Sequence, residues 1–227
     1  MNLWFFLIRI IYLLIFVKKQ AILLTMNFPH IIENTIYFLA LINPPSKILL
    51  LSSKKPPFSR KELFSIAARS TFAALIILLI LTVAGNFILT NIFQVEIYSL
   101  SIAGGIILFF VGLSAVKQGK FYEEKDAQKI ADMSIVPLAA PLIAGPGTMT
   151  AAISFASMHG TLITLICITL ALGINMAFML MSAQIGKFLE KTNTTGPLIR
   201  ITGLIVTAVA MQMILNGCGN WLDKIID

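Results

Sequence analysis

The stretch FLALINPPSK at residues 38–47 places Asn-Pro-Pro in the middle of an apolar run. Proline has no backbone N–H and clashes with the preceding helical turn, so a helix crossing this stretch is interrupted at Pro44. The stretch PLAAPLIAGPGT at residues 137–148 interrupts a later apolar run in the same way. In a bilayer the freed carbonyl groups need partners, and such backbone survives only against protein or a wet cavity. The two stretches therefore predict a membrane fold built around two broken helices.

The composition indicates the same class of protein. Of 227 residues, 58% are hydrophobic and only 12% are charged, and the mean hydropathy is +0.91. A soluble domain is typically about 25% charged, so this chain has too few charges to cover a water-soluble globule of its length. The composition excludes a disordered chain, a disulfide scaffold and a nucleic-acid-binding module. It indicates a polytopic membrane protein whose surroundings are the lipid bilayer.

Six apolar runs have the length of membrane-spanning helices, which is about 20 residues each. They are continuously apolar, whereas the strands of a membrane barrel alternate in polarity. The expected fold is all-α, with six transmembrane helices of which the first and fourth are broken. The expected spans are residues 31–53, 67–89, 97–116, 134–158, 161–185 and 197–215.

Lysine and arginine occur in alternate connections between these runs. The first, third and fifth connections are basic, whereas the second and fourth contain neither residue. Because basic residues concentrate in cytoplasmic loops, both ends of the six-helix unit are expected outside the cell membrane. The net charge of +7 is thus interpreted as an orientation signal.

The two interruptions lie at equivalent places in two three-helix halves. Pro44 and Pro146 are 102 residues apart, and Gly105 and Gly203 are 98 residues apart. An odd number of spans per repeat turns the second copy over, so the halves are expected to be inverted repeats. The expected organisation is an N-terminal extension at 1–25, a first repeat at 26–120, a cytoplasmic loop at 121–133 and a second repeat at 134–227.

Residues 1–25 do not fit the six-helix pattern. As a seventh span they would place Lys18 and Lys19 in an external loop, against the charge rule. Met26 is therefore the expected natural start, and an additional or interfacial helix is the rival interpretation.

Paired interruptions in inverted repeats are typical of secondary transporters, whose substrate site lies near the middle of the membrane. Half-helices that restart near Ser46 and Thr148 present free N–H groups and positive dipole ends, which suit a carboxylate. The residues expected at a substrate site are Asn43, Pro44, Ser46, Lys47, Gly145, Gly147, Thr148 and Asn175.

Several of these residues have a second interpretation. The interruptions can also be kinks that let helices pack closely, and Gly105 and Gly203 are expected at close helix contacts. Lys47 either lines a cavity and meets a carboxylate or extends to the cytoplasmic surface. Asn175 either makes an interhelical hydrogen bond or contacts substrate, and His159 is expected to be solvated in a short external link.

Acidic residues are expected only near span ends, at Glu33, Glu96 and Asp132, so a carboxylate proton relay is not supported. The sequence has no metal-ligand spacing and no phosphate-binding glycine loop. Neither an enzyme nor a cofactor or metal site is therefore expected.

Four segments resemble motifs of the MarC family of prokaryotic integral membrane proteins: NPPSK at 43–47, IAGG at 102–105, IVPLA at 135–139 and APLIAGPGT at 140–148. The resemblance covers about residues 26–215. It implies six spans in a fold like that of the lysine-exporter superfamily, in the cytoplasmic membrane. It also implies a link to transport of small neutral amino acids, with which one type of member is associated. Ser101 stands where the family often has an arginine.

The expected function is a secondary transporter of small solutes such as neutral amino acids, with protons or sodium as candidate coupling ions. The alternative is a non-transporting membrane scaffold or partner subunit, in which the interruptions serve packing alone. No oligomeric state is predicted.

Overall fold

The computed structural model describes residues 28–52, 56–119 and 143–226, and these residues form helices and short connections without a strand. The expected helical class is confirmed for this part of the chain. In chain order the elements are α2 (Phe28–Ile42), α3 (Pro44–Ser52), α4 (Arg60–Phe87), the π-helical turn η1 (Ile88–Ile92), α5 (Ile97–Gln118), α7 (Pro146–His159), α8 (Thr161–Leu180), α9 (Ser182–Lys191) and α10 (Thr195–Ile226).

Five helical segments in the described ranges are long and apolar enough to cross a membrane. They are Pro29–Ser52, Arg60–Ile92, Ile97–Gln118, Thr161–Leu180 and Thr195–Ile226. The second half of the expected fourth span is α7. Residues 134–142 of that span, the extension at 1–25 and the loop at 121–133 lie outside the described residues. The protein is thus an integral multi-pass membrane protein, and the arrangement of its halves as inverted repeats stays a prediction.

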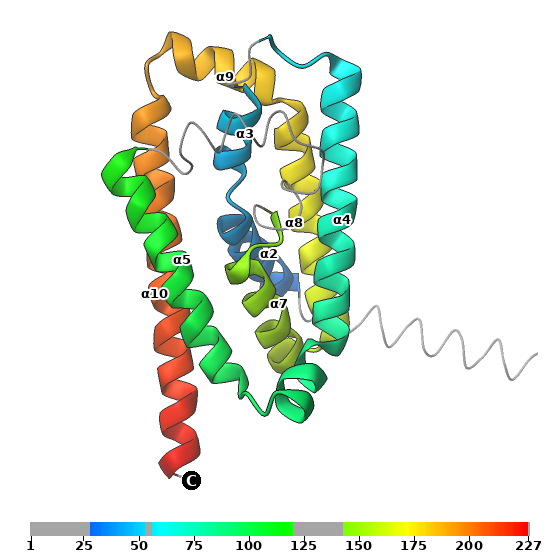
Figure 1. The fold of residues 1–227 in the computed structure, drawn as a ribbon, viewed down its shortest axis with the longest axis vertical. Coiled ribbons are helices and arrows are strands. Elements are labelled where there is room, and N and C mark those ends of the chain that lie inside the picture. The colour runs from blue at the N-terminus through cyan, green and yellow to red at the C-terminus, as the bar shows by residue number, and fades with distance from the viewer. Residues whose placement is uncertain (1–27, 53–55, 120–142, 227) are drawn as a thin grey trace, which may run out of the picture.

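Three expected span boundaries are wrong, and the structure gives a reason for each. The second span begins at Arg60 because Ser59 and Glu62 form a capping box there. The fifth span ends at Leu180, where the chain turns and α9 crosses the end of the bundle (Figure 1). The sixth continues to Ile226, since α10 keeps packing along α5 beyond residue 215.

The basic connections gather at one end of the bundle. Helix α9, the start of α4, the end of α5 and the start of α10 all lie at this end, opposite the C-terminus (Figure 1). The basic residues of these segments are Arg60, Lys61, Lys117, Lys187, Lys191 and Arg200. The alternation of basic and bare connections therefore corresponds to a separation in space. That this end faces the cytoplasm stays a prediction.

Helices α5 and α10 pack closely through glycines that face each other. A Cβ atom on Gly112 would lie 2.8 Å from the carbonyl oxygen of Gly203, and one on Gly203 would lie 3.0 Å from that of Gly112. A Cβ atom on Gly105 would lie 2.9 Å from the carbonyl oxygen of Ala210. Small residues let helix backbones approach in a membrane, where water does not drive helices together. Gly105 and Gly203 thus lie at close helix contacts, as expected.

The apolar core lies between α2, α4, α7 and α8. Phe38, Leu78, Ala152 and Ile168 come from these four helices and are fully buried. Large apolar side chains on the outward faces, such as Phe72 and Phe110, are exposed. Because outward faces of membrane-spanning helices are apolar, we expect these exposed side chains to face lipid.

The glycine contact between α5 and α10 can be tested by a matched pair of alanine substitutions. We expect Gly112→Ala to lower the free energy of unfolding by about 1–3 kcal/mol, because the added methyl group overlaps α10. Gly173→Ala is the control, since nothing lies within 4 Å of its added Cβ atom. It should be neutral or slightly stabilising. Denaturant unfolding of the detergent-purified variants measures both, and equal effects would contradict the close contact.

Candidate functional site

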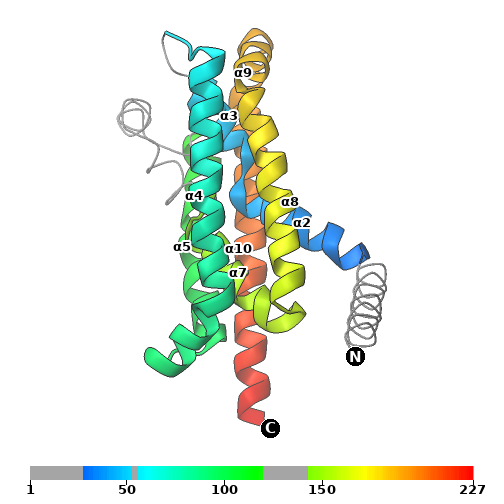
Figure 2. The same cartoon turned by 90° about the vertical axis from the view of Figure 1, so that its right-hand side faces the viewer.

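The first interruption is a single residue in a left-handed conformation. Asn43 separates α2 from α3 with a φ of 55°, which asparagine tolerates better than most residues. Its N–H still donates to the carbonyl of Leu39 at 2.8 Å, so α2 keeps its hydrogen bonds up to this point. The chain then changes direction, and α2 tilts away from the long axis that the other helices follow (Figure 2).

Side chains from the start of α3 supply donors to the carbonyl groups freed at this interruption. Ser46 Oγ donates to the carbonyl oxygen of Asn43 at 2.7 Å. The Lys47 ammonium donates to the carbonyl of Ile42 and, at 3.2 Å, to Ser46 Oγ. Lys47 is only 2% exposed, so the interpretation that it extends to the cytoplasmic surface is wrong. Within the described residues no carboxylate pairs with it.

At the second predicted interruption, the carbonyl groups just before α7 are satisfied in a similar way. Helix α7 starts at Pro146 after Gly145. Thr148 Oγ1 donates to the carbonyl oxygens of Gly145 at 2.9 Å and Ile143 at 3.0 Å. Ser46 and Thr148 thus both bond to the carbonyl three residues before them. Each hydroxyl donates its proton to a backbone carbonyl. Its oxygen atom can still accept a hydrogen bond from another donor.

The two interruptions lie at mid-height in the bundle, where α2 ends and α7 begins (Figure 1). The two helices contact each other through Phe38 and Phe155, whose ring centroids are 5.5 Å apart. Gly147 packs against α5, since its added Cβ would lie 3.0 Å from Leu108. The structure therefore brings α2, α7 and α5 together around the interruptions.

Asn175 lies in α8 and is fully buried. Its Nδ2 atom is 3.4 Å from the sulfur of Met179 in the same helix. Its Oδ1 atom has no hydrogen-bond partner among the described residues. The expected interhelical hydrogen bond is thus absent from this part of the chain. A buried amide oxygen without a partner costs free energy, and Asn175 is a polar point in the apolar core.

A cavity of about 490 Å³ lies between α2, α5, α7 and α10. None of the residues expected at the substrate site lines it. Its residues nearest to the interruptions are Tyr37 and Ala151. With a helical rise of 1.5 Å per residue, these lie roughly 9 Å from Asn43 and roughly 5 Å from Thr148 along their helices. The cavity is lined by His30, Glu33, Asn34, Tyr37, Ser101, Ala151, Ser154, Phe155, Met158, His159, Gln212, Met213, Asn216 and Asn220.

The polar lining follows a helical pattern that is visible in the sequence. His30, Glu33, Asn34 and Tyr37 have the spacing i, i+3, i+4 and i+7, which places them on one face of α2. In α10, Gln212, Asn216 and Asn220 repeat every four residues. A stripe of polar residues along one face of an otherwise apolar span is the sequence feature that could have predicted this cavity. The expected site was built instead on the proline and glycine positions, so these residues were missed.

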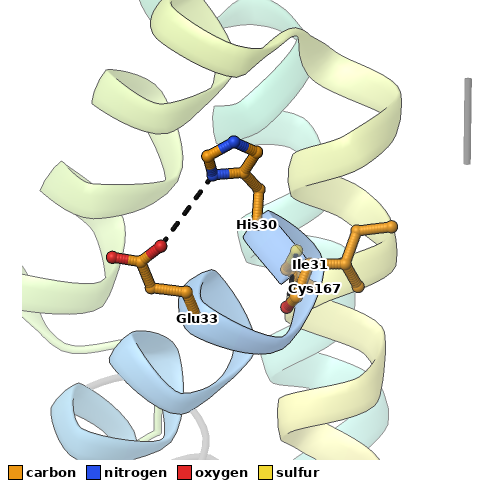
Figure 3. Close-up of polar contacts among 4 residues, drawn as sticks. All are labelled: His30, Ile31, Glu33 and Cys167. Carbon is orange, nitrogen blue, oxygen red and sulfur yellow. Dashed lines mark hydrogen bonds and ion pairs between the residues drawn. The ribbon is translucent and has the colours of Figure 1, made fainter. Parts of the chain in front are cut away.

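The mouth of the cavity combines a carboxylate with two imidazoles. His30 Nδ1 lies 3.8 Å from Glu33 Oε2 (Figure 3). The ring of His159 lies 6.5 Å from that of His30 and 5.3 Å from that of Phe155. His159 is exposed as expected, and it also contributes to the cavity wall. No lysine or arginine lines this cavity within the described residues.

Helix α2 is held against α8 behind this mouth. The thiol of the buried Cys167 contacts the carbonyl oxygen of Ile31 at 3.6 Å (Figure 3). The contact joins residues that are 136 positions apart in the sequence. It fixes the turn of α2 that carries His30 and Glu33, so these side chains project from a supported backbone.

The comparison with protein families covers both interruptions and the whole cavity. The family model of MarC family integral membrane proteins matches residues 28–222. The chain belongs to the MarC family. The resemblance of the NPPSK and APLIAGPGT segments is thereby confirmed.

Relatives of this MarC protein occur in archaea and bacteria. A UPF0056 membrane protein of Pyrococcus horikoshii is 35% identical over 87% of this chain and 97% of its own length. One from Methanocaldococcus jannaschii is 33% identical over 78% of this chain and 90% of its own. One from Bacillus subtilis is 28% identical over 85% and 95%. No solved structure matches the chain.

The hydroxyl group at the second interruption can be tested with two conservative variants. We expect Thr148→Val to lower the free energy of unfolding by about 1–3 kcal/mol, because the carbonyl of Ile143 loses the donor that Thr148 provides, whereas the carbonyl of Gly145 keeps the N–H of Met149. Thr148→Ser keeps the hydroxyl, as Ser46 does at the first interruption, and should cost less. Denaturant unfolding in detergent compares the two. Equal losses would show that the hydroxyl does not hold the interruption.

Proposed function

We propose that this MarC protein is a secondary transporter of small solutes such as neutral amino acids. The observation that carries the proposal is a polar cavity that extends from one end of the bundle toward two helix interruptions at mid-height. Interrupted helices at a central site are a recurrent construction in secondary transporters. The cavity provides an access route, and the interruptions provide polar backbone roughly 5–9 Å beyond its inner end, measured along α2 and α7.

The size and lining of the cavity favour a small polar solute. Ligand pockets commonly measure about 300–1,000 Å³, and a volume of about 490 Å³ holds an amino acid with water. Amides and hydroxyls dominate the polar lining. Beyond the inner end, the Lys47 ammonium has three protons and two acceptors among the described residues. Its third proton is available to a solute carboxylate that reaches the interruption.

The packing of the helices supports a movement that could alternate access. Helices α5 and α10 are joined along their length by glycines, and they form one wall of the cavity. Helices α2 and α7 form the other wall. Rocking of the α5–α10 pair against α2 and α7 would close the cavity at its open end, as rigid-body mechanisms require. By the positive-inside rule, we expect that open end to face the outside of the cell.

Uptake by proteoliposomes tests the proposal. We expect uptake of labelled glycine or alanine under a proton gradient or a sodium gradient, above the level of protein-free vesicles. Ser154→Trp should abolish most of this uptake, because the indole fills the cavity between its walls. Ile205→Trp is the matched control, since Ile205 is an exposed apolar residue on α10 and faces lipid.

Two results would count against transport. One is the absence of uptake of any amino acid under every gradient. The other is equal uptake by Ser154→Trp and Ile205→Trp, because a solute that crosses through the cavity is blocked only by the first. Either result would favour the alternative of a membrane scaffold, in which the interruptions serve packing alone.

A further inference from the structure

We infer that the cavity contains a subsite that binds both ends of a zwitterionic α-amino acid. Glu33 binds the ammonium group, and Asn34, Tyr37 and Ser101 donate hydrogen bonds to the carboxylate. The inference rests on the proposed function, since it names the groups that recognise the solute. It places recognition in the outer cavity, before the solute reaches the helix interruptions.

Two side chains in the cavity wall have no hydrogen-bond partner among the described residues. Asn34 on α2 and Ser101 on α5 are each only 7% exposed, and both line the cavity. Neither side chain forms a hydrogen bond with any described residue. Among the described residues, the fully buried side-chain atoms without a partner belong to Thr35, Thr71 and Asn175, so the polar atoms of Asn34 and Ser101 are open to the cavity. Because the cavity is the open space beside them, it is where a partner would bind.

The phenol of Tyr37 is the third donor of this wall. Its ring lies 5.1 Å from the ring of Phe155, which holds it against α7. Tyr37 follows Asn34 by one helical turn, so the two side chains lie on one face of α2. An amide N–H₂ and two hydroxyls are neutral donors, which pair with a carboxylate without the cost of burying a cation.

Glu33 supplies the opposite charge at the same depth of α2. Its side chain is exposed at the mouth of the cavity, 3.8 Å from His30 Nδ1. Because no lysine or arginine lines the cavity in the described residues, no permanent cation neutralises it. Glu33 and Tyr37 are four residues apart, which places their Cβ atoms about 5–6 Å from each other. A single carbon separates the two charged groups of an α-amino acid, so both fit between these side chains.

Binding in detergent tests the subsite separately from flux. Isothermal titration calorimetry with glycine as the probe is expected to show saturable binding. Glu33→Gln should weaken it several-fold, because a neutral amide replaces the charged partner of the ammonium group, and the Glu33 side chain is largely exposed to solvent. Tyr37→Phe and Ser101→Ala should each weaken it several-fold, because each removes one hydroxyl. Glu190→Gln, an exposed acid at the other end of the bundle, is the control and should bind as wild type.

Two analogues test the two ends of the ligand. N-acetylglycine lacks the ammonium group and glycinamide lacks the carboxylate, so each should bind far more weakly than glycine. The inference is overturned by absence of glycine binding, by unchanged affinity in Glu33→Gln, or by binding of either analogue as tightly as glycine. Binding with this profile but without uptake supports the subsite and contradicts the transporter. Uptake that is insensitive to Glu33→Gln supports the transporter and contradicts the subsite.

Discussion

The structure depends on donors for the backbone carbonyl groups that two helix interruptions leave in an apolar bundle. Lipid offers no donors, so the chain must provide them itself. Ser46 and Lys47 provide them at the first interruption, and Thr148 provides them at the second. With these bonds made, α2 can tilt from the bundle axis at Asn43, and α7 can begin at mid-height. The cavity lies beside these two half-helices.

The polar residues at the interruptions and those that line the cavity have different roles. Those at the interruptions are bonded to the backbone, so most of their hydrogen-bonding capacity is used inside the protein. Those in the cavity, such as Asn34 and Ser101, have no partner among the described residues and face the open space. In the proposed transport cycle, the first group keeps the helices interrupted and the second group binds the solute. The glycine contact between α5 and α10 keeps one wall of this space rigid.

Much of the fold could be predicted, because hydropathy and the effect of proline are local. The membrane class, the helical spans and the interruption at Asn43-Pro44 all follow from short stretches of sequence. Span ends were less predictable, since the start of α4 depends on a polar capping box and the end of α10 on packing against α5. The surface position considered for Lys47 was wrong because a carbonyl group freed two residues upstream of Pro44 accepts its proton.

The sequence by itself determined that this is a helical membrane protein of the MarC family whose first span is interrupted at Asn43-Pro44, and it predicted a second interruption before α7. The sequence also contains polar residues at helical spacing in α2 and α10, which place a polar stripe on one face of each helix. Only the tertiary structure decided that these stripes share one cavity with Ser101 of α5 and the end of α7. The physical reason is that helical periodicity defines a face, whereas the neighbour of that face depends on how closely distant helices pack. Here the glycines of α5 and α10 set how closely these two helices pack.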